Sequence, residues 1–358
     1  MTCFLKLRDA MTQKATLLEQ SAFLKACRRE KTPYTPIWLM RQAGRYMKEY
    51  RDLRAKTPFL ELCKNKDLAT EITVSAQEKI GADAAIIFSD ILLIVEPFGL
   101  GLEYIKGDGP SVARVRSARD IEALPEIDPK ESLSFVMDAI RQTRQALRPD
   151  VPLIGFAGAP FTLASYMIEG GPSDDFLATK GLMRGEPELW KKLMAKITHA
   201  TIKYLSAQIE AGVQAVQIFD SWVGCLSAEE YEKSVFPYSQ HVILGLKSKV
   251  PVIHFGTNTP HLLSLMSKAG GDVIGVDHRI QLDEAWKRIG WDKAVQGNLD
   301  PKILCSSVSE IKKHVEAILR QAGSRPGHIF NLGHGVLPET PVENVIALVD
   351  MVHDLSRR

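Results

Sequence analysis

Eight short apolar runs, separated by longer amphipathic stretches, constrain the fold of this chain more than any other feature. The runs are four to seven residues long and cover 36–40, 84–88, 151–156, 213–219, 252–255, 272–276, 294–297 and 328–332. Short, mainly apolar runs are typical of parallel strands that are buried on both faces. Eight such strands alternating with helices close a barrel. We therefore predict an α/β fold, a single (β/α)8 TIM barrel domain that covers residues 1–358.

A doubly wound open sheet is the main alternative architecture, and a length of 358 residues would also allow two domains. An open sheet that binds a dinucleotide carries a Gly-x-Gly-x-x-Gly turn between a strand and a helix, and no such turn follows a run here. Polar residues instead follow nearly every run, as expected when the loops at one end of a closed barrel form a ring. The sequence therefore favours the barrel.

The stretches between the runs carry helix start and stop signals. We predict long helices over 67–79, 187–210 and 227–247. Asp67 and Ser227 are placed as N-caps, and Pro187 lies in a first helical turn. Gly81 and Gly212 follow as C-terminal stops.

Two further segments lie outside the regular alternation. Residues 17–29 precede the first run and are predicted to form a helical N-terminal extension at the bottom of the barrel. Between residues 96 and 125, glycine and proline are frequent and no helical period is visible. This composition predicts an inserted loop or hairpin.

Composition and charge argue against several classes of function. The formal net charge is only +2, whereas proteins that bind nucleic acid or membrane surfaces usually carry a pronounced basic excess. The five cysteines form no Cys-x-x-Cys pair, and we interpret them as reduced thiols of a cytoplasmic protein. Residues 1–12 show no secretory signal, and no apolar run reaches the length of a membrane span.

Candidate functional residues follow the apolar runs, at the end of the strands where the active site of a (β/α)8 barrel lies. They come from five different parts of the chain and comprise Arg41, Arg45, Asp90, Tyr166, Ser221 and His334. A guanidinium group forms bidentate, charge-assisted hydrogen bonds with carboxylates. The two arginines therefore indicate a ligand that is rich in carboxylates.

The spacing of the two arginines has two interpretations. A helix that began directly after the first run would place Arg41 and Arg45 on one face, where both could bind one ligand. Alternatively, Arg45 pairs with Glu49 on a surface helix. Gly44 lies between the arginines, and a glycine at a helix start indicates close approach of a ligand or of backbone.

Each remaining candidate also has a structural alternative. Asp90 stands in an apolar setting where a carboxylate must be paired, hydrogen-bonded or protonated, but Asp90 or Ser89 could equally cap a helix. Tyr166, Ser221 and His334 could be a rim tyrosine, a cap and a turn residue. Their positions after separate runs, beside two arginines and an aspartate, favour a shared site.

No metal or cofactor site is predicted. Gly256 stands two residues after His254, where a zinc-binding pair would need a thiolate, and neither Cys225 nor Cys305 has ligand-like spacing. The sequence contains no glycine-rich phosphate loop, no nucleotide fingerprint and no motif that would indicate a Schiff-base lysine. We therefore expect a protein that uses neither a cofactor nor a metal.

Four motifs occur together in one order along the chain. They are Arg-Gln-Ala-Gly-Arg at 41–45, Phe-Ser-Asp at 88–90, Pro-Phe-Thr-Leu at 160–163 followed by Tyr166, and Asn-Leu-Gly-His-Gly at 331–335. With the longer stretches 36–46 and 158–170 around the first and third motif, they resemble the uroporphyrinogen decarboxylase family. The resemblance covers essentially the whole chain.

The resemblance implies a one-domain (β/α)8 barrel, usually a homodimer, that acts in porphyrin and haem biosynthesis without metal or prosthetic group. The implied reaction converts the four acetate side chains of uroporphyrinogen III to methyl groups and releases carbon dioxide and coproporphyrinogen III. The implied substrate-binding residues are Arg41, Gln42, Ala43, Gly44, Arg45, Asp90, Tyr166, Ser221 and His334. Asp90 would lie beside the pyrrole N–H groups, and the catalytic roles would belong to Asp90 and Arg41.

The chemistry of this reaction agrees with the residues. A pyrrole acetate loses carbon dioxide easily only after protonation makes the ring an electron sink, so the enzyme must stabilise a cation. A buried aspartate can do so by preorganised electrostatics. Arg41 is a favoured proton donor in this family, but arginine is nominally too weak an acid. The sequence leaves the donor open.

Two other classes of function remain. Barrels that resemble this one include zinc-dependent methyltransferases that act on methylated corrinoids or thiols, and stoichiometric zinc in the purified protein would favour that class. A non-catalytic tetrapyrrole carrier would bind porphyrinogen tightly without releasing carbon dioxide.

Overall fold

A parallel sheet of seven strands forms the centre of the computed structural model, which describes residues 16–105, 109–246 and 250–358. In the order of their pairing, the strands are β1 (Ala85–Ile86), β4 (Leu153–Gly158), β5 (Ala215–Asp220), β6 (Val252–Gly256), β7 (Val273–Gly275), β8 (Ala294–Gln296) and β9 (His328–Ile329). Each strand overlaps one of the predicted apolar runs. The prediction of a parallel α/β sheet is therefore confirmed.

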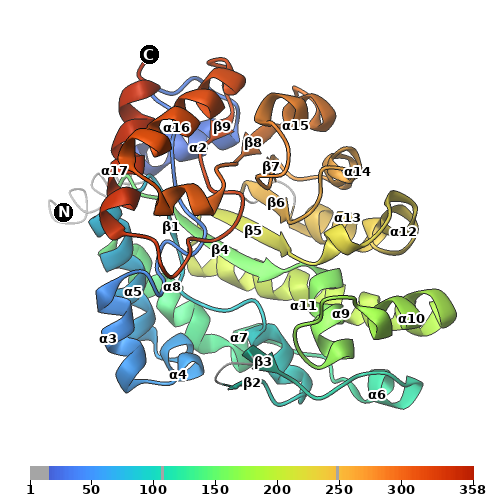
Figure 1. Cartoon of the computed structure of the whole chain (residues 1–358). Helices are drawn as coiled ribbons and strands as arrows, with labels where there is room; N and C mark the ends of the chain where they lie inside the picture. Colours follow the sequence, from blue (N-terminus) through green and yellow to red (C-terminus); the bar gives the residue numbers. More distant parts are fainter. Residues whose placement is uncertain (1–15, 106–108, 247–249) are drawn as a thin grey trace, which may run out of the picture.

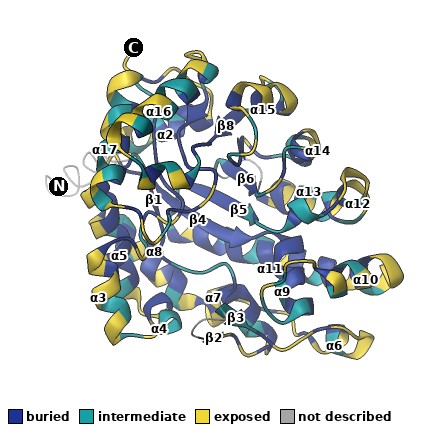
Figure 2. Ribbon diagram, viewed as in Figure 1, coloured by how far each residue is buried: buried dark blue, intermediate teal, exposed yellow. Residues whose placement is uncertain are grey.

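Helices cover the outer face of the sheet, because each parallel connection must cross back over it. The connecting helices are α8 (Ser134–Ala146) before β4; α9 (Pro160–Glu169), α10 (Leu177–Gly185) and α11 (Pro187–Ala211) before β5; α12 (Ala228–Ser234) and α13 (Phe236–Leu246) before β6; and α14 (Leu263–Ala269), α15 (Leu282–Ile289) and α16 (Val308–Ala322) before β7, β8 and β9. Helix α17 (Val342–Leu355) follows β9 (Figure 1). The strands are buried, whereas the helices expose their outer sides (Figure 2). None of the described helices combines the length and the apolar character that a membrane crossing requires.

The first predicted run, residues 36–40, is not a regular strand, and this corrects the prediction of eight strands that close a barrel. Ile37 forms only an isolated parallel bridge, to Phe330 just after β9. Backbone hydrogen bonds join Phe330 N–H to Pro36 O (2.8 Å) and Asp83 N–H to Ile37 O (2.8 Å). The segment thus touches both edges of the sheet without extending the ladder.

Side chains explain why this segment forms no ladder. The N–H group of Ile37 donates to a carboxylate oxygen of Asp83 (2.7 Å), and the N–H group of Met40 donates to the Asn331 side chain (3.2 Å). Pro36 has no N–H group to contribute. The N–H groups of Ile37 and Met40, which a regular ladder would need, therefore donate to side chains instead.

Polar side chains cross the interior of the curved sheet. The indole N–H of Trp38 donates to Gln296 Oε1 (2.9 Å), and Gln296 Nε2 donates to Gln217 Oε1 (2.9 Å). All three side chains are buried. Gln217 belongs to β5 and Gln296 to β8, which are separated in the sheet by β6 and β7. The sheet therefore curls enough for non-adjacent strands to share one interior.

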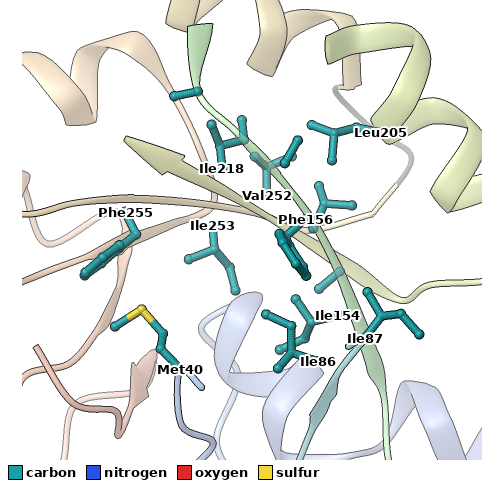
Figure 3. Close-up of a cluster of buried hydrophobic side chains, with 14 of the residues drawn as sticks. Met40, Ile86, Ile87, Ile154, Phe156, Leu205, Ile218, Val252, Ile253 and Phe255 are labelled. Carbon is teal, nitrogen blue, oxygen red and sulfur yellow. The ribbon is translucent and has the colours of Figure 1, made fainter. Parts of the chain in front are cut away.

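Apolar side chains fill the space on both faces of the strands. In Figure 3, Leu205 of α11 lies beside Ile218 and Val252 on the helix side. Ile86 and Ile154 lie together on the other side of the strands. Burial of these side chains removes apolar surface from water, and this is the main favourable contribution to folding.

The predicted helix signals are largely confirmed, with two corrections. Helix α5 (Lys66–Ile80) is capped by Asn65, whose side chain accepts from two backbone N–H groups, and not by Asp67, which lies inside the helix. The predicted helix 227–247 is broken into α12 and α13 around Val235. Pro237, two residues on, cannot donate a hydrogen bond to the preceding turn, and this accounts for the break. Residue 247, the predicted end, lies outside the described residues.

The stops and the other starts agree with the structure. Gly81 and Gly212 end α5 and α11 in the left-handed conformation. Pro187 opens α11. Ser227 caps α12 and forms a capping box with Glu230.

The remaining elements lie at the start of the chain and in the predicted insertion. Helix α2 (Ala22–Cys27) falls inside the segment 17–29 and packs against β9, while residues 1–12 lie outside the described part. Helices α3 (Lys48–Lys56) and α4 (Phe59–Lys64) precede α5. The segment 96–125 contains the predicted hairpin, β2 (Glu103–Ile105) and β3 (Gly109–Ser111), together with part of η1 (Leu93–Phe98) and helix α6 (Ala118–Ala123). Short helical turns complete the described chain: α7 (Pro129–Ser132), η2 (Val223–Cys225) and η3 (Pro301–Cys305).

Candidate active site

The predicted functional residues lie after the carboxyl ends of different strands. Asp90 follows β1, Tyr166 lies in α9 directly after β4, and Ser221 is the residue after β5. His334 follows β9, and Arg41 follows the bridging segment 36–40. Because parallel strands end at one edge, these positions belong to the same end of the sheet.

Asp90 is half-buried in an apolar setting. Its Oδ1 atom accepts a hydrogen bond from the N–H group of Leu92 (2.8 Å). Burial raises the pKa of the Asp90 carboxyl above its ordinary value; the Leu92 N–H, a hydrogen bond from the Tyr104 hydroxyl and the charge of Arg41 act in the opposite direction and only partly offset it. The carboxyl group therefore has few compensating partners, which is typical of functional acids.

Tyr104 is a site residue that the sequence did not predict. It lies in β2 of the hairpin, and its ring contacts the ring of Phe59 with a centroid distance of 4.7 Å. Phe59 in turn contacts Phe88, two residues before Asp90, with a centroid distance of 6.0 Å. These aromatic contacts bring the hairpin to the end of β1, where the Tyr104 hydroxyl hydrogen-bonds Asp90. Burial and the charge of Asp90 keep the pKa of Tyr104 well above its usual value, so the phenol stays protonated and donates.

Arg41 connects Asp90 with the other candidates. Its positive charge acts on Asp90, on Tyr166 and on His334, and lowers the pKa of each. Its backbone has a φ of 61°, a left-handed conformation that is rare for a residue with a side chain. Such a conformation costs on the order of 1 kcal/mol or more and tends to occur at functional sites. The strained turn directs Arg41 toward these groups.

Tyr166 and Ser221 are joined through Trp222. The ring centroids of Tyr166 and Trp222 lie 5.8 Å apart. The backbone N–H of Trp222 donates to the hydroxyl of Thr162 in α9 (3.4 Å). The hydroxyl of Thr257 donates to the carbonyl of Ser221. Burial and the charge of Asp90 raise the pKa of Tyr166 to about 12. At neutral pH this phenol is therefore a hydrogen-bond donor close to Asp90.

His334 lies on a turn between two glycines that pack against other parts of the site. A Cβ atom on Gly335 would lie 2.7 Å from Cγ of Arg41, and one on Gly333 would lie 2.8 Å from Cβ of His278. Although His334 is partly exposed, surrounding protein lowers its pKa, and so do the charges of Arg41, His278 and Arg279. Its imidazole is therefore neutral at physiological pH.

The predicted helix after the first run is absent, which corrects the expected arrangement of Arg41 and Arg45. Residues 41–47 form irregular turns, and the next helix, α3, begins only at Lys48. Arg45 is exposed, and no described contact links it to Asp90. The alternative pairing of Arg45 with Glu49 is not observed either, because Glu49 pairs with Lys79 (2.5 Å).

Gln42, Ala43 and Gly44 support this turn. The amide of Gln42 is buried, accepts from Leu39 N–H (3.2 Å) and donates to Ala84 O (3.2 Å). Ala43 lines a cavity of about 410 Å³ beside Met47 of the same turn. A Cβ atom on Gly44 would lie 2.9 Å from the Arg41 carbonyl oxygen. These residues shape the backbone that carries Arg41, and a direct contact with a ligand remains a prediction.

Two polar residues at strand ends lie apart from this cluster. Asp220 and His254 are fully buried, with Asp220 Oδ2 and His254 Nε2 3.7 Å apart, and the hydroxyl of Thr162 in α9 donates to Asp220 Oδ1 (3.2 Å). Both residues alternate with Phe219 and Phe255 along their strands. They therefore belong to the face that α9 covers. Within the described ranges, no group of three or more His, Cys, Asp or Glu side chains could hold a metal ion.

Comparison with known proteins assigns the chain to a family. The uroporphyrinogen decarboxylase family model matches residues 18–355. The chain belongs to the uroporphyrinogen decarboxylase family. It is 54% identical over 336 residues to a uroporphyrinogen decarboxylase of Carboxydothermus hydrogenoformans, covering 93% of this chain and 96% of the relative. It is 53% identical to one of Sorangium cellulosum, with 94% and 96% covered. The resemblance found in the motifs is thus confirmed.

Solved structures show the same fold at much lower identity. A methyltransferase from Methanosarcina mazei superimposes with a TM-score of 0.80, at 22% identity, over 94% of this chain and 98% of that one. A B12-independent methionine synthase from a Shewanella species gives a TM-score of 0.55 at 13% identity, over 81% and 88% of the two chains. These similarities concern the fold alone.

Proposed function

We propose that this chain is a carboxy-lyase that decarboxylates the four acetate side chains of uroporphyrinogen III to give coproporphyrinogen III and carbon dioxide. The proposal depends above all on Asp90, a half-buried acid that Tyr104 and Arg41 face at the carboxyl end of β1. Membership in the uroporphyrinogen decarboxylase family supports it. The reaction would belong to porphyrin and haem biosynthesis.

The proposed chemistry requires an anion at the centre of the site. Protonation of a pyrrole carbon makes the ring cationic, and the bond between the acetate methylene and its carboxylate then breaks. The electron pair passes into the ring, a proton adds to the exocyclic carbon to form the methyl group, and the ring loses the proton that it had gained. The Asp90 carboxylate would accept the pyrrole N–H groups and stabilise the cation, an effect that is largest where water is excluded.

The other residues would bind and orient the substrate. Arg41 would hold a carboxylate, and its proximity to Asp90 supports its place as the second catalytic residue. Tyr166, near Asp90, and Ser221 and neutral His334, at the same end of the sheet, would offer hydrogen-bond donors to the substrate. Gln42, Ala43, Gly44 and Arg45 complete the proposed binding set, with Arg45 approaching the substrate from the exposed side of the turn. Because these residues would hold the carboxylates and the ring in place on binding, less entropy would be lost on reaching the transition state.

The finer architectural expectations also belong to the proposal. We propose that residues 1–358 form a single domain, in which residues 17–29 are an N-terminal helical extension of the α/β fold. We further propose a cytoplasmic homodimer whose partner is the small-molecule substrate, with no nucleic acid or membrane partner and no cofactor or metal.

The direct test is an anaerobic assay of the purified protein with uroporphyrinogen III. Chromatography of the oxidised products should show hepta-, hexa- and pentacarboxylate intermediates and a final tetracarboxylate. Substrate that keeps all its carboxylates would reject the proposal. Tight binding without carbon dioxide release would instead support a tetrapyrrole carrier.

Elemental analysis of the same preparation tests the remaining alternative. The fold similarity to a methyltransferase makes this control worthwhile. We expect substoichiometric zinc and full activity after treatment with a chelator. One zinc per chain, with activity that depends on it, would favour the methyltransferase class.

A further inference from the structure

The turn that follows β7 is rigid. The Asp277 carboxylate is buried and accepts hydrogen bonds from the N–H groups of Asn258 (2.5 Å) and Arg279 (3.0 Å). The side-chain amide of Asn298 donates to the Asp277 carbonyl (2.8 Å). Three loops are thereby tied to one acid, and the backbone at Arg279 is held in place.

This turn packs directly against the turn that carries His334. Gly333 is tightly enclosed, because an added Cβ atom would lie 2.8 Å from Cβ of His278 and 2.9 Å from the carbonyl carbon of Asp277. The Arg41 side chain packs against Gly335 in the same way, because an added Cβ atom on Gly335 would lie 2.7 Å from Cγ of Arg41. A continuous rim therefore runs from Arg41 through the 333–335 turn to residues 277–279.

Arg279 contributes a second positive charge to this rim. Its side chain is 49% exposed, and Nη1 lies 3.4 Å from Asp277 Oδ2, a long and weak ion pair. Its charge acts on His334 together with that of Arg41, and both lower the pKa of the imidazole. Two guanidinium groups that face one neutral histidine repel each other unless an anion lies between them.

Asp277 accounts only in part for the position of the guanidinium, because the single hydrogen bond from Arg279 Nη1 to Asp277 Oδ2 is long, at 3.4 Å. Both of its oxygens already accept backbone N–H groups, from Asn258 at Oδ2 and from Arg279 at Oδ1. Charged groups that are buried need such partners, and this carboxylate has them without the Arg279 side chain. The guanidinium is half-exposed, and its charge acts on His334.

We propose that Arg279 is a further substrate-binding residue, which grips a peripheral carboxylate of the tetrapyrrole from the β7 side of the site. The inference deepens the proposed function and rests on it, because the ligand is the same polycarboxylate macrocycle. Arg279 would act beside Arg41 and Arg45 as a third guanidinium group for the carboxylates of the substrate. A planar guanidinium suits a carboxylate because it can donate two parallel hydrogen bonds.

Steady-state kinetics with uroporphyrinogen III and equilibrium binding of uroporphyrin, its oxidised and unreactive counterpart, test this role. For R279A we expect KM and the Kd for uroporphyrin to rise about tenfold, equivalent to ~1.4 kcal/mol, with kcat changed less than about twofold because binding is lost uniformly. R279K keeps the charge but not the fork, and should restore part of the affinity. R288A is the matched control, since Arg288 is 43% exposed and pairs with Glu284 (3.0 Å) on α15, away from the rim.

The outcomes separate this inference from the proposed function. Unchanged KM and Kd in R279A, with wild-type decarboxylation intact, would overturn the role of Arg279 and leave the function standing. Equal losses in R279A and R288A would also overturn it, because they would show only a general effect of net charge. If the wild-type protein bound uroporphyrin without decarboxylating the porphyrinogen, the proposed function would fail, and the affinity of R279A would still test the carboxylate contact.

Discussion

Two aspartates lie at opposite ends of β1, and their surroundings differ. Asp83, before the strand, accepts from the Tyr34 hydroxyl (2.9 Å), the Ile37 N–H (2.7 Å) and His353 Nε2 (2.8 Å). Asp90, after the strand, accepts one backbone N–H and the hydroxyl of a hairpin residue, and burial raises its pKa. One carboxylate is paired from three sides, and the other is left short of partners.

The difference separates stability from chemistry along a single strand. The amino end of a (β/α)8 strand is where conserved interactions usually serve stability, and the carboxyl end is where they serve catalysis. Asp83 joins the bridging segment, β1 and α17, so its partners hold the beginning and the end of the described chain together. Asp90 has few hydrogen-bonding or charged partners, and a cationic intermediate would supply the missing positive charge. The following substitutions should reveal this contrast.

Substitution of the underpaired acid should have the largest effect. In Asp90→Asn, we expect kcat for uroporphyrinogen to fall about a hundredfold to a thousandfold, as for removal of a preorganised electrostatic partner. The midpoint of urea unfolding should not decrease, because the substitution removes a poorly compensated charge. Near-normal turnover in this variant would exclude Asp90 from the mechanism.

The opposite result is expected at the other end of the strand. Asp83→Ala leaves three donors without their acceptor, and we expect it to lower the free energy of unfolding by about 2–3 kcal/mol. The kcat of the folded fraction should stay close to wild type. Asp138→Ala is the control, because Asp138 is 48% exposed and pairs only across one helical turn with Arg141. A loss of kcat without loss of stability in Asp83→Ala would contradict the comparison.

The third prediction concerns the hydroxyl group that partly compensates Asp90. Tyr104→Phe keeps the ring contact with Phe59 but removes a hydrogen bond that lowers the pKa of Asp90. The pKa should therefore rise further, so a smaller fraction of Asp90 is ionised at a given pH. We expect the acidic limb of the kcat/KM profile to move to higher pH, with about a fivefold loss at its acidic end. Tyr238→Phe, a half-exposed tyrosine of α13, should leave the profile unchanged.

The smallest effect should come from the histidine that pairs with Asp83. Burial lowers the pKa of His353, but the hydrogen bond and the charge of Asp83 outweigh it and raise the pKa above the ordinary value. The charged histidine thus stabilises the fold below about pH 6.5, the ordinary histidine value, and this contribution is lost as the pH rises through the raised value. At low pH, the free energy of unfolding of the wild type should exceed that of His353→Gln by less than about 1 kcal/mol. A difference that grew toward alkaline pH would refute this linkage.

The sequence predicted the features that depend on nearest neighbours and local composition. Apolar runs became strands because they are buried on both faces, and Pro187 and Gly81 kept their roles because backbone geometry demands them. Asp90 and Tyr166 could be expected at one end of the sheet because each follows an apolar run that became a strand, β1 and β4.

Features that depend on distant partners were missed. Tyr104 reaches Asp90 only because the ring of Phe59 holds the hairpin, and no spacing in the sequence reveals that contact. The segment 36–40 is apolar like a strand, but side chains such as Asp83 and Asn331 take its donors. Asp67 and Asn65 are both good caps, and only the structure shows which one binds the first turn.

The two hydrogen bonds that connect Trp38, Gln296 and Gln217 have a consequence for folding during translation. The first of these bonds joins residues 258 positions apart in the chain. The indole cannot find its acceptor until most of the polypeptide has left the ribosome, and contacts of such long range slow folding. The apolar residues around Trp38 should therefore stay exposed to solvent during translation. We expect chaperones that recognise nascent chains to bind this stretch.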